Sequence, residues 1–209
     1  MLIKEIMHAN PIFVSPQTTL TDAYDLMNKI SARHLPILEN DKLVGIVTDR
    51  DLRLATSKLA PQIFDPTSRV SEIMNYPVQT THPTEPIEVA TQVMRELKIG
   101  CLPVLEDSKL VGIVTGVDIL DAMLLLTGVH TSSGRLDVRM KDKTGEIARL
   151  TKLIADRNIS IHSILSYQDT NERLRVVLRI STIDIRSLAN AICSADFEVL
   201  WPAQISCAE

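Results

Sequence analysis

The sequence predicts an α+β protein in which two copies of one mixed unit precede a separate βαββαβ domain. The first observation is a repeat: the segment HLPILENDKLVGIVTDRDL, which begins at His34, returns 67 residues later as CLPVLEDSKLVGIVTGVDI, which begins at Cys101. The second is a change of pattern beyond residue 134, where apolar residues alternate along strands and then recur at helical spacing. We therefore expect domains at residues 1–60 (copy one), 68–127 (copy two) and 135–209.

Each copy is expected to hold a short strand, a helix, two more strands and a closing helix. In copy one the short strand spans residues 12–14, and Thr18 or Thr19 caps a helix that ends near Ser31. Residues 35–38 and 43–47 are expected to be strands joined by a turn. The second of these is nearly all apolar, which favours a strand buried on both faces. Asp49 begins the closing helix, which is expected to run toward Lys58.

The C-terminal domain follows a linker at residues 128–134, whose sequence is GVHTSSG. Alternating apolar residues predict strands at residues 136–140, 159–167, 174–180 and 197–201. Helical stripes predict helices at residues 147–154 and 185–192, and Ser181 and Asp184 are expected to cap the second one. This order, βαββαβ, is the ferredoxin-like pattern.

Composition excludes several classes of protein. The net charge is −4 with both signs mixed, which argues against a nucleic-acid binder. No apolar run approaches the ~20 residues of a membrane span, and no signal-peptide pattern opens the sequence, so we expect a cytoplasmic protein. The cysteines, Cys101, Cys193 and Cys207, have no metal spacing and are expected to be reduced. The five histidines are scattered, and we expect neither a metal site nor a catalytic site.

The junction between the last strand and the closing helix carries the chemistry. Thr48 and Asp51 in copy one, like Thr115 and Asp118 in copy two, place a hydroxyl three residues before a carboxylate. One interpretation is a helix cap alone. The other is a nucleotide site, because free backbone N–H groups at a helix start donate to phosphate oxygens and a carboxylate accepts two hydrogen bonds from a ribose diol. A single residue can fill both roles.

These repeated motifs, KLVGIVTDRDL and KLVGIVTGVDI, resemble a tandem pair of CBS domains, also called a Bateman module, over residues 1–127. The resemblance implies two clefts that bind adenosine ligands such as AMP, ADP, ATP or S-adenosylmethionine. It also implies that the threonine contacts the ribose-phosphate region and the aspartate the ribose hydroxyls. The candidate nucleotide-binding residues are Arg33, His34, Thr48, Arg50, Asp51, Thr115 and Asp118.

The C-terminal segment DKTGEIARLTKLIADRNISI resembles an ACT domain, a small-molecule regulatory module. Members of that family often have proline where this sequence has Thr144. The resemblance implies an amino-acid or metabolite site at a dimer interface, built on Asp142, Thr144 and Gly145. The alternative is that these residues form only a strand-to-helix turn. A CBS pair followed by an ACT domain resembles the acetoin-utilisation type of bacterial regulatory protein.

The expected function is that of a non-enzymatic, ligand-sensing regulator that forms a homodimer and acts on a protein target. The alternative is a structural adaptor whose CBS clefts stay empty. We also expect one tight site per chain, in copy one. Copy two has Gly100, Cys101 and Val117 where copy one has Arg33, His34 and Arg50, so cations that could hold a phosphate are lost.

Overall fold

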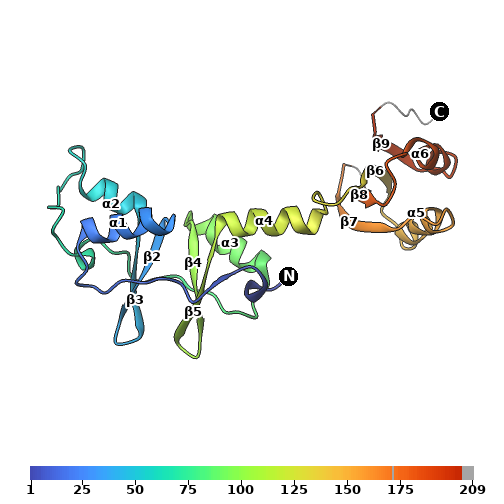
Figure 1. The fold of residues 1–209 in the computed structure, drawn as a ribbon. Helices are drawn as coiled ribbons and strands as arrows, with labels where there is room; N and C mark the ends of the chain where they lie inside the picture. Colours follow the sequence, from blue (N-terminus) through green and yellow to red (C-terminus); the bar gives the residue numbers. More distant parts are fainter. Residues whose placement is uncertain (171, 204–209) are drawn as a thin grey trace. The chain divides into compact units, whose positions relative to one another are not determined.

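The protein divides into two compact units, Met1–Leu120 and Asp121–Glu209, each described here by itself (Figure 1). The computed structural model describes residues 1–170 and 172–203. The fold is the mixed α/β arrangement that the sequence predicted, with the repeat first and the βαββαβ domain second. Within the described residues, no helix is both long enough and apolar enough to cross a membrane.

The two copies have the same elements in the same order. Each contains a helix, an antiparallel hairpin and a closing helix, and each hairpin has a register shift at the equivalent step, Ile37/Leu38 and Val104/Leu105. Copy one contains α1 (Leu20–Ile30), β2 (His34–Glu39), β3 (Lys42–Thr48) and α2 (Asp49–Ala55). Copy two contains α3 (Ile87–Leu97), β4 (Cys101–Glu106), β5 (Lys109–Thr115) and α4 (Gly116–Thr127).

Local chemistry sets the start and end of α1. The Thr19 side chain accepts a hydrogen bond from the backbone N–H of Asp22 at 3.0 Å, which confirms the expected cap. Ser31 ends the helix in the left-handed conformation with φ 54°, and Lys98 ends α3 in the same way with φ 55°. These matched ends turn the chain directly into β2 and β4.

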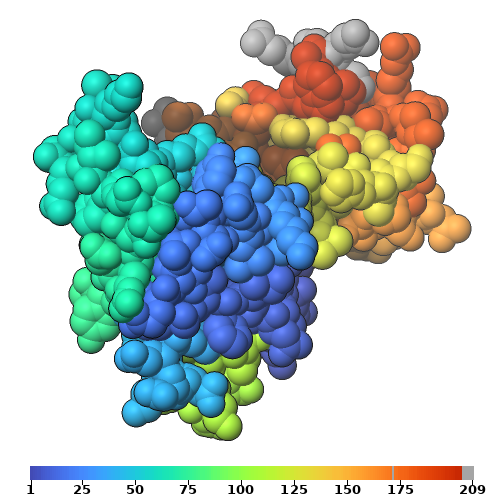
Figure 2. Space-filling view, turned by 60° about the vertical axis from the view of Figure 1, so that its left-hand side comes forward, coloured from blue at the N-terminus to red at the C-terminus, as the bar shows by residue number. Residues whose placement is uncertain are grey.

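The lead-in segments of the two copies, residues 1–9 and 68–76, cross over and pack on the opposite copy. In the first, η1 (Ile3–Glu5) and β1 (His8–Ala9) contact copy two: the Ile3 N–H donates to the Glu85 carbonyl at 2.9 Å, and β1 pairs with β5. In the second, η2 (Val70–Glu72) contacts copy one, where the Val70 N–H donates to the Thr18 carbonyl at 2.9 Å. Figure 2 shows this second lead-in, in teal, against the blue surface of copy one.

Three expectations about copy one need correction. Residues 12–14 do not form a strand, because only Val14 makes an isolated bridge, to Ile37. The helix α2 stops at Ala55 and does not run on toward Lys58. Burial on both faces holds for Gly45, Ile46 and Val47 but not for the first half of β3, which reaches the surface at Lys42.

The second unit has the expected βαββαβ order. It contains β6 (Gly134–Lys141), α5 (Glu146–Ala155), β7 (Ile161–Gln168), β8 (Arg173–Ile180), α6 (Arg186–Cys193) and β9 (Glu198–Trp201). The strands form one antiparallel sheet in the order β7-β8-β6-β9. Its core joins the apolar faces of β6 and β8 to those of the two helices, including Val138, Leu178, Leu150 and Leu188.

Two further expectations about this unit are wrong. The N-cap of α6 is Ile185, and the expected serine cap is absent because the Ser181 hydroxyl instead accepts from the Ser160 N–H at 3.0 Å. Of the expected pair only Asp184 contacts the helix start, where its carboxylate accepts from the Arg186 N–H at 3.3 Å. Among the cysteines, Cys101 is a free, buried thiol, but Cys193 is disulfide-bonded, so the expectation of reduced thiols fails there. Cys207 lies outside the described residues.

Candidate functional site

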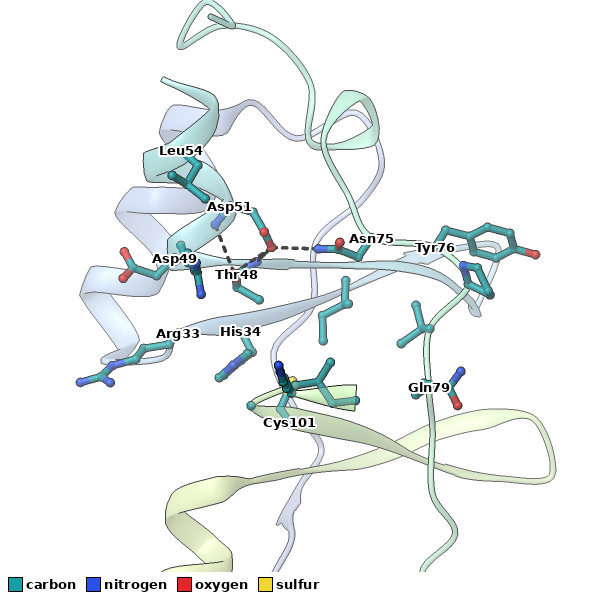
Figure 3. Close-up of a pocket in the computed structure, with 17 residues that line it drawn as sticks. Arg33, His34, Thr48, Asp49, Asp51, Leu54, Asn75, Tyr76, Gln79 and Cys101 are labelled. Atoms are coloured by element: carbon teal, nitrogen blue, oxygen red, sulfur yellow. Dashed lines mark hydrogen bonds between the residues drawn. The ribbon is translucent and has the colours of Figure 1, made fainter. Parts of the chain in front are cut away.

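A cleft of about 840 Å³ opens in the first unit at the junction of β3 and α2 (Figure 3). Both copies of the repeat contribute to the cleft, each through two segments. Copy one supplies the end of the α1–β2 connection and the β3–α2 junction; copy two supplies residues 75–79 and the α3–β4 connection. The lining residues are Arg33, His34, Ile46, Thr48, Asp49, Arg50, Asp51, Leu54, Asn75, Tyr76, Pro77, Val78, Gln79, Lys98, Ile99, Gly100 and Cys101.

The carboxylate of Asp51 is held in one orientation by three donors. Its Oδ2 accepts hydrogen bonds from the Thr48 backbone N–H at 2.9 Å, from the Thr48 hydroxyl at 2.7 Å and from the Asn75 side-chain amide at 2.9 Å. Thr48 also caps α2, since its Oγ1 accepts from the Asp51 N–H at 3.2 Å. All three donors meet one oxygen, and Oδ1 of Asp51 has no hydrogen-bonding partner among the described residues.

The charges around Asp51 are mostly positive. Arg33, Arg50 and Lys98 all line the cleft and are exposed, so their charged ends can move toward an anionic ligand. The remaining carboxylate, Asp49, is paired with Arg53 at 2.8 Å, which offsets its charge. Arg53 itself does not line the cleft, so the cations that can meet a ligand there are Arg33, Arg50 and Lys98.

His34 and Cys101 lie at the point where the two copies meet. Burial is the main reason that the pKa of His34 is lowered from 6.5, and the neighbouring Arg33 lowers it further, whereas Asp51 acts in the opposite direction. Burial, helped by Asp51, raises the pKa of the Cys101 thiol to about 12. Both side chains are therefore neutral at pH 7, and Cys101 is an unreactive thiol.

Apolar side chains complete the cleft. Ile46 and Cys101 belong to a small buried cluster that joins the two hairpins, and Val78 packs against it. Together with Ile99 and Leu54 they give the cleft an apolar side beside the polar Asp51 group. A flat ring can thus be buried next to a carboxylate and three cations.

The equivalent junction in copy two has a different partner. Oδ2 of Asp118 accepts from the Thr115 N–H and the Thr115 hydroxyl, both at 2.7 Å, as in copy one. Its Oδ1, however, lies 2.9 Å from Nε2 of His8. His8 occupies the repeat position of Asn75: the two are 67 residues apart, and each pairs with a strand of the opposite copy, His8 with Ile113 and Asn75 with Ile46.

The structure brings together only some of the residues that the sequence predicted. Arg33, His34, Thr48, Arg50 and Asp51 share the cleft, while Thr115 and Asp118 form the separate junction of copy two. The candidates in the second unit are all exposed in the turn between β6 and α5. There the Asp142 carboxylate accepts from the Gln168 side-chain amide at 2.6 Å, and Gly145 begins α5 with φ 93°. A shallow cleft in this unit does not include these three candidates and lies along α5 and the start of β7.

Sequence reasoning missed Asn75, Tyr76, Gln79 and Lys98 as lining residues. Asn75 lies 24 residues from Asp51, and nothing in a single copy reveals that its lead-in crosses to the opposite copy. The 67-residue offset could have flagged Asn75 and His8 as one repeat position with two side chains. Lys98 could have been predicted as a lining residue only by assuming that the two copies of the repeat pack with two-fold symmetry.

Comparisons with known proteins agree with this geometry. The CBS domain model matches residues 3–58 and 70–125, and the ACT domain model matches residues 134–196. The CBS domain-containing protein YhcV of Bacillus subtilis is 34% identical over 112 residues, which cover 54% of this chain and 78% of YhcV. Inosine-5'-monophosphate dehydrogenase of Methanocaldococcus jannaschii is 32% identical over 134 residues, which cover 63% of this chain but only 25% of that enzyme.

Two solved structures are similar over the CBS pair. The CBS domain pair of the protein MJ0100, in complex with 5'-methylthioadenosine and S-adenosyl-L-methionine, has 31% identity and a TM-score of 0.54, covering 59% of this chain and 95% of that one. A putative acetoin utilization protein (AcuB) from Vibrio cholerae has 33% identity and a TM-score of 0.53, covering 62% and 94%. The latter supports the resemblance to acetoin-utilisation regulators. This chain therefore belongs to the CBS-domain family, as a tandem pair of CBS domains followed by an ACT domain.

Proposed function

We propose that this protein is a non-enzymatic regulator that senses an adenosine-containing ligand in the Asp51 cleft. The observation that carries the proposal is the Asp51 carboxylate, which is fixed through Oδ2 and open at Oδ1 inside a cleft of about 840 Å³. A fixed carboxylate with a free oxygen suits the two hydroxyls of a ribose.

Each part of such a ligand has a counterpart in the cleft. The ribose diol donates to Asp51, the adenine ring lies against the apolar side formed by Ile46, Val78 and Ile99, and an anionic tail meets Arg50 or Lys98. Burying ~100 Å² of ring at ~25 cal/mol per Å² contributes about 2.5 kcal/mol. Charge-assisted hydrogen bonds add about 1.5–3 kcal/mol each, so three of them bring the total into the range of about 8 kcal/mol that micromolar binding needs.

The relatives support the adenosine part of the ligand more than its tail. MJ0100 holds 5'-methylthioadenosine and S-adenosyl-L-methionine, which share adenosine and differ in what is attached to it. AMP, ADP and ATP carry the same group with phosphates. Three cations around the cleft favour a ligand with an anionic tail. An amino acid or other metabolite at Asp142, Thr144 and Gly145, a role in acetoin use, and a cytoplasmic location stay predictions.

Titration calorimetry with adenosine, AMP, ATP and S-adenosylmethionine tests the proposal. We expect one tight site per chain, loss of at least tenfold in affinity for Asp51→Asn, and little change for the matched variant Asp118→Asn. The asparagine keeps the shape of the side chain but removes its charge. No binding of any of the four by the wild-type protein would instead favour the structural adaptor with empty clefts.

We further propose that the chain forms a homodimer. Its support is α4, where large apolar side chains such as Leu120, Leu124 and Leu125 are exposed, although a helix that is apolar all round is normally covered. Light scattering at micromolar concentration should give twice the mass of the 23.2 kDa chain. A stable monomer would contradict this part of the proposal without affecting the ligand site.

A further inference from the structure

The carboxylates of Asp51 and Asp118 occupy the same repeat position but have different hydrogen-bonding partners. In copy one, Oδ2 of Asp51 takes all three hydrogen bonds and Oδ1 stays free among the described residues. In copy two, Oδ2 of Asp118 takes the two bonds from Thr115, and Oδ1 is occupied by Nε2 of His8 at 2.9 Å. Both carboxylate oxygens of Asp118 therefore already have a partner.

The difference comes from one repeat position. Asn75 and His8 both sit on a lead-in that has crossed to the opposite copy and pairs there with β3 or β5. The short Asn75 amide reaches the same oxygen that Thr48 already uses. The longer imidazole of His8 instead reaches the other oxygen, Oδ1 of Asp118.

His8 is the more exposed partner in its contact with Asp118. The side chain of His8 is 69% exposed, whereas that of Asp118 is 9% exposed. A diol that binds Oδ1 of Asp118 must displace the imidazole of His8 from that oxygen. The element that carries His8 is held by backbone pairing of β1 with β5, so the imidazole is positioned there without a ligand.

We propose that His8 acts as an internal competitor at the Asp118 junction and is the residue that limits the chain to one adenosine site. This rests on the proposed function, because it assumes that the free oxygen of Asp51 binds a ribose diol. Displacing one charge-assisted hydrogen bond weakens a competing ligand by roughly ten- to hundredfold. His8 is not among the residues that line the Asp51 cleft.

The effect of His8 is separate from the loss of arginine side chains in copy two. Val117 and Gly100 stand where copy one has Arg50 and Arg33, so a phosphate would be held less well in copy two whatever His8 does. Adenosine itself, which has no phosphate, isolates the contribution of His8. It is therefore the probe for the test.

The experiment measures adenosine binding by calorimetry in a series of full-length variants. Asp51→Asn should remove the site of copy one. Adding His8→Asn, which restores the Asn75 arrangement, should make a site appear that binds at least tenfold more tightly than any residual binding of Asp51→Asn alone. Adding Asp118→Asn as a third change should remove it again. His8→Ala in place of His8→Asn is the second variant, and circular dichroism confirms that each protein is folded.

The outcomes separate this inference from the proposed function. If the wild-type protein does not bind adenosine or AMP, the proposed function fails. If the wild-type protein binds and Asp51→Asn does not, but neither His8 variant restores binding, the function stands and His8 is not the competitor. If Asp51→Asn keeps a site as tight as the wild type, the Asp118 junction is open and the inference is overturned.

Discussion

The side-chain amide of Asn75 donates to Oδ2 of Asp51 at 2.9 Å, although the two residues belong to different copies of the repeat. The orientation of the carboxylate in one CBS domain is thus set partly by the lead-in of the other. Thr48 supplies the remaining two bonds from within copy one.

Replacing Asn75 by alanine should weaken adenosine binding in the Asp51 cleft by roughly 3- to 10-fold, the value of one ordinary hydrogen bond. The reason is that Asp51 loses one of its three positioning donors and gains rotational freedom. Calorimetry measures the dissociation constant of the tight site. His8→Ala, at the same repeat position in the other lead-in, is the control: it should leave the constant of the Asp51 site unchanged while a second site opens at Asp118. An equal loss of affinity at the Asp51 site in both variants would place the cause outside the cleft.

Binding of a phosphate-bearing ligand should be accompanied by proton uptake near pH 6. Burial and Arg33 lower the pKa of His34 from its ordinary value of 6.5, so a larger fraction of this imidazole is neutral there in the free protein than of an ordinary histidine. A phosphate in the cleft favours the protonated form and raises the pKa again. Calorimetry of AMP in two buffers with different ionisation enthalpies measures the uptake. Adenosine, and the variant His34→Asn, should show none; uptake that persists in His34→Asn belongs to another group.

The lowered pKa of His34 also determines how the stability of the free protein changes with pH. Because the folded-state pKa of His34 is lower than the unfolded value of about 6.5, the unfolded chain binds more protons as the pH falls below that value. The contribution of His34 should therefore destabilise the first unit below pH 6.5 and vanish above it.

Gly45 and Met74 should behave as a coupled pair in unfolding experiments. A methyl group on Gly45 would clash with the Met74 sulfur and lie 3.0 Å from its Cγ. Gly45→Ala is expected to cost about 1–3 kcal/mol through overpacking, and much less in a Met74→Ala background, where the space is free. Urea denaturation of the two single variants and the double variant gives the coupling. Additive effects would show that the Met74 side chain moves aside without cost.

Acid should destabilise the second unit through Asp137, which is 1% exposed on β6. Burial by itself raises the pKa of this carboxyl, but hydrogen bonds from Arg135 and Arg175 outweigh burial and hold the pKa below its ordinary value. A lowered pKa stabilises the fold above the unfolded value of about 3.9 and loses that effect as the pH falls through the folded value.

The variant Asp137→Asn should therefore lose about 3 kcal/mol at pH 7, the lower end of the cost of breaking a buried pair, because both arginines keep some access to water. As the pH falls below about 3.9 toward the lowered folded-state pKa, the stability difference between the variant and the wild type should shrink. Trp201 is the only tryptophan and pairs with Asp137 across the sheet, so its fluorescence follows unfolding of this unit. A difference that is the same at pH 3 and pH 7 would mean that charge is not the cause.

Much of the site could be predicted because its central residues are local in sequence. Thr48 and Asp51 are three residues apart, and a helix start brings a hydroxyl and an acid together without help from the rest of the chain. The βαββαβ order was predictable for a similar reason, since periods of two and of 3.6 residues appear within each element. The cap of α6 was not, because the Ser181 hydroxyl accepts from Ser160, whose position depends on the fold.

The rest of the site depends on contacts over long sequence separations. Lys98 enters the cleft because α3 ends in a left-handed residue beside β2 of the opposite copy, which periodicity within one copy does not show. His8 was only one of five scattered histidines until β1 was seen to pair with β5. Sequence patterns specify the elements well, whereas packing between the copies decides which side chains meet.

The crossing of the lead-ins has a consequence for how such a chain can change over time. A chain with a single copy could satisfy the same contacts only as a two-fold dimer in which each subunit lends its N-terminal arm to the other, and its stability would then depend on concentration. Joining two copies in tandem makes the exchange of arms intramolecular, with an effective concentration set by the linker. It also ends the requirement that both arms be identical. One arm can then keep the asparagine that leaves a carboxylate open while the other carries a histidine that closes it.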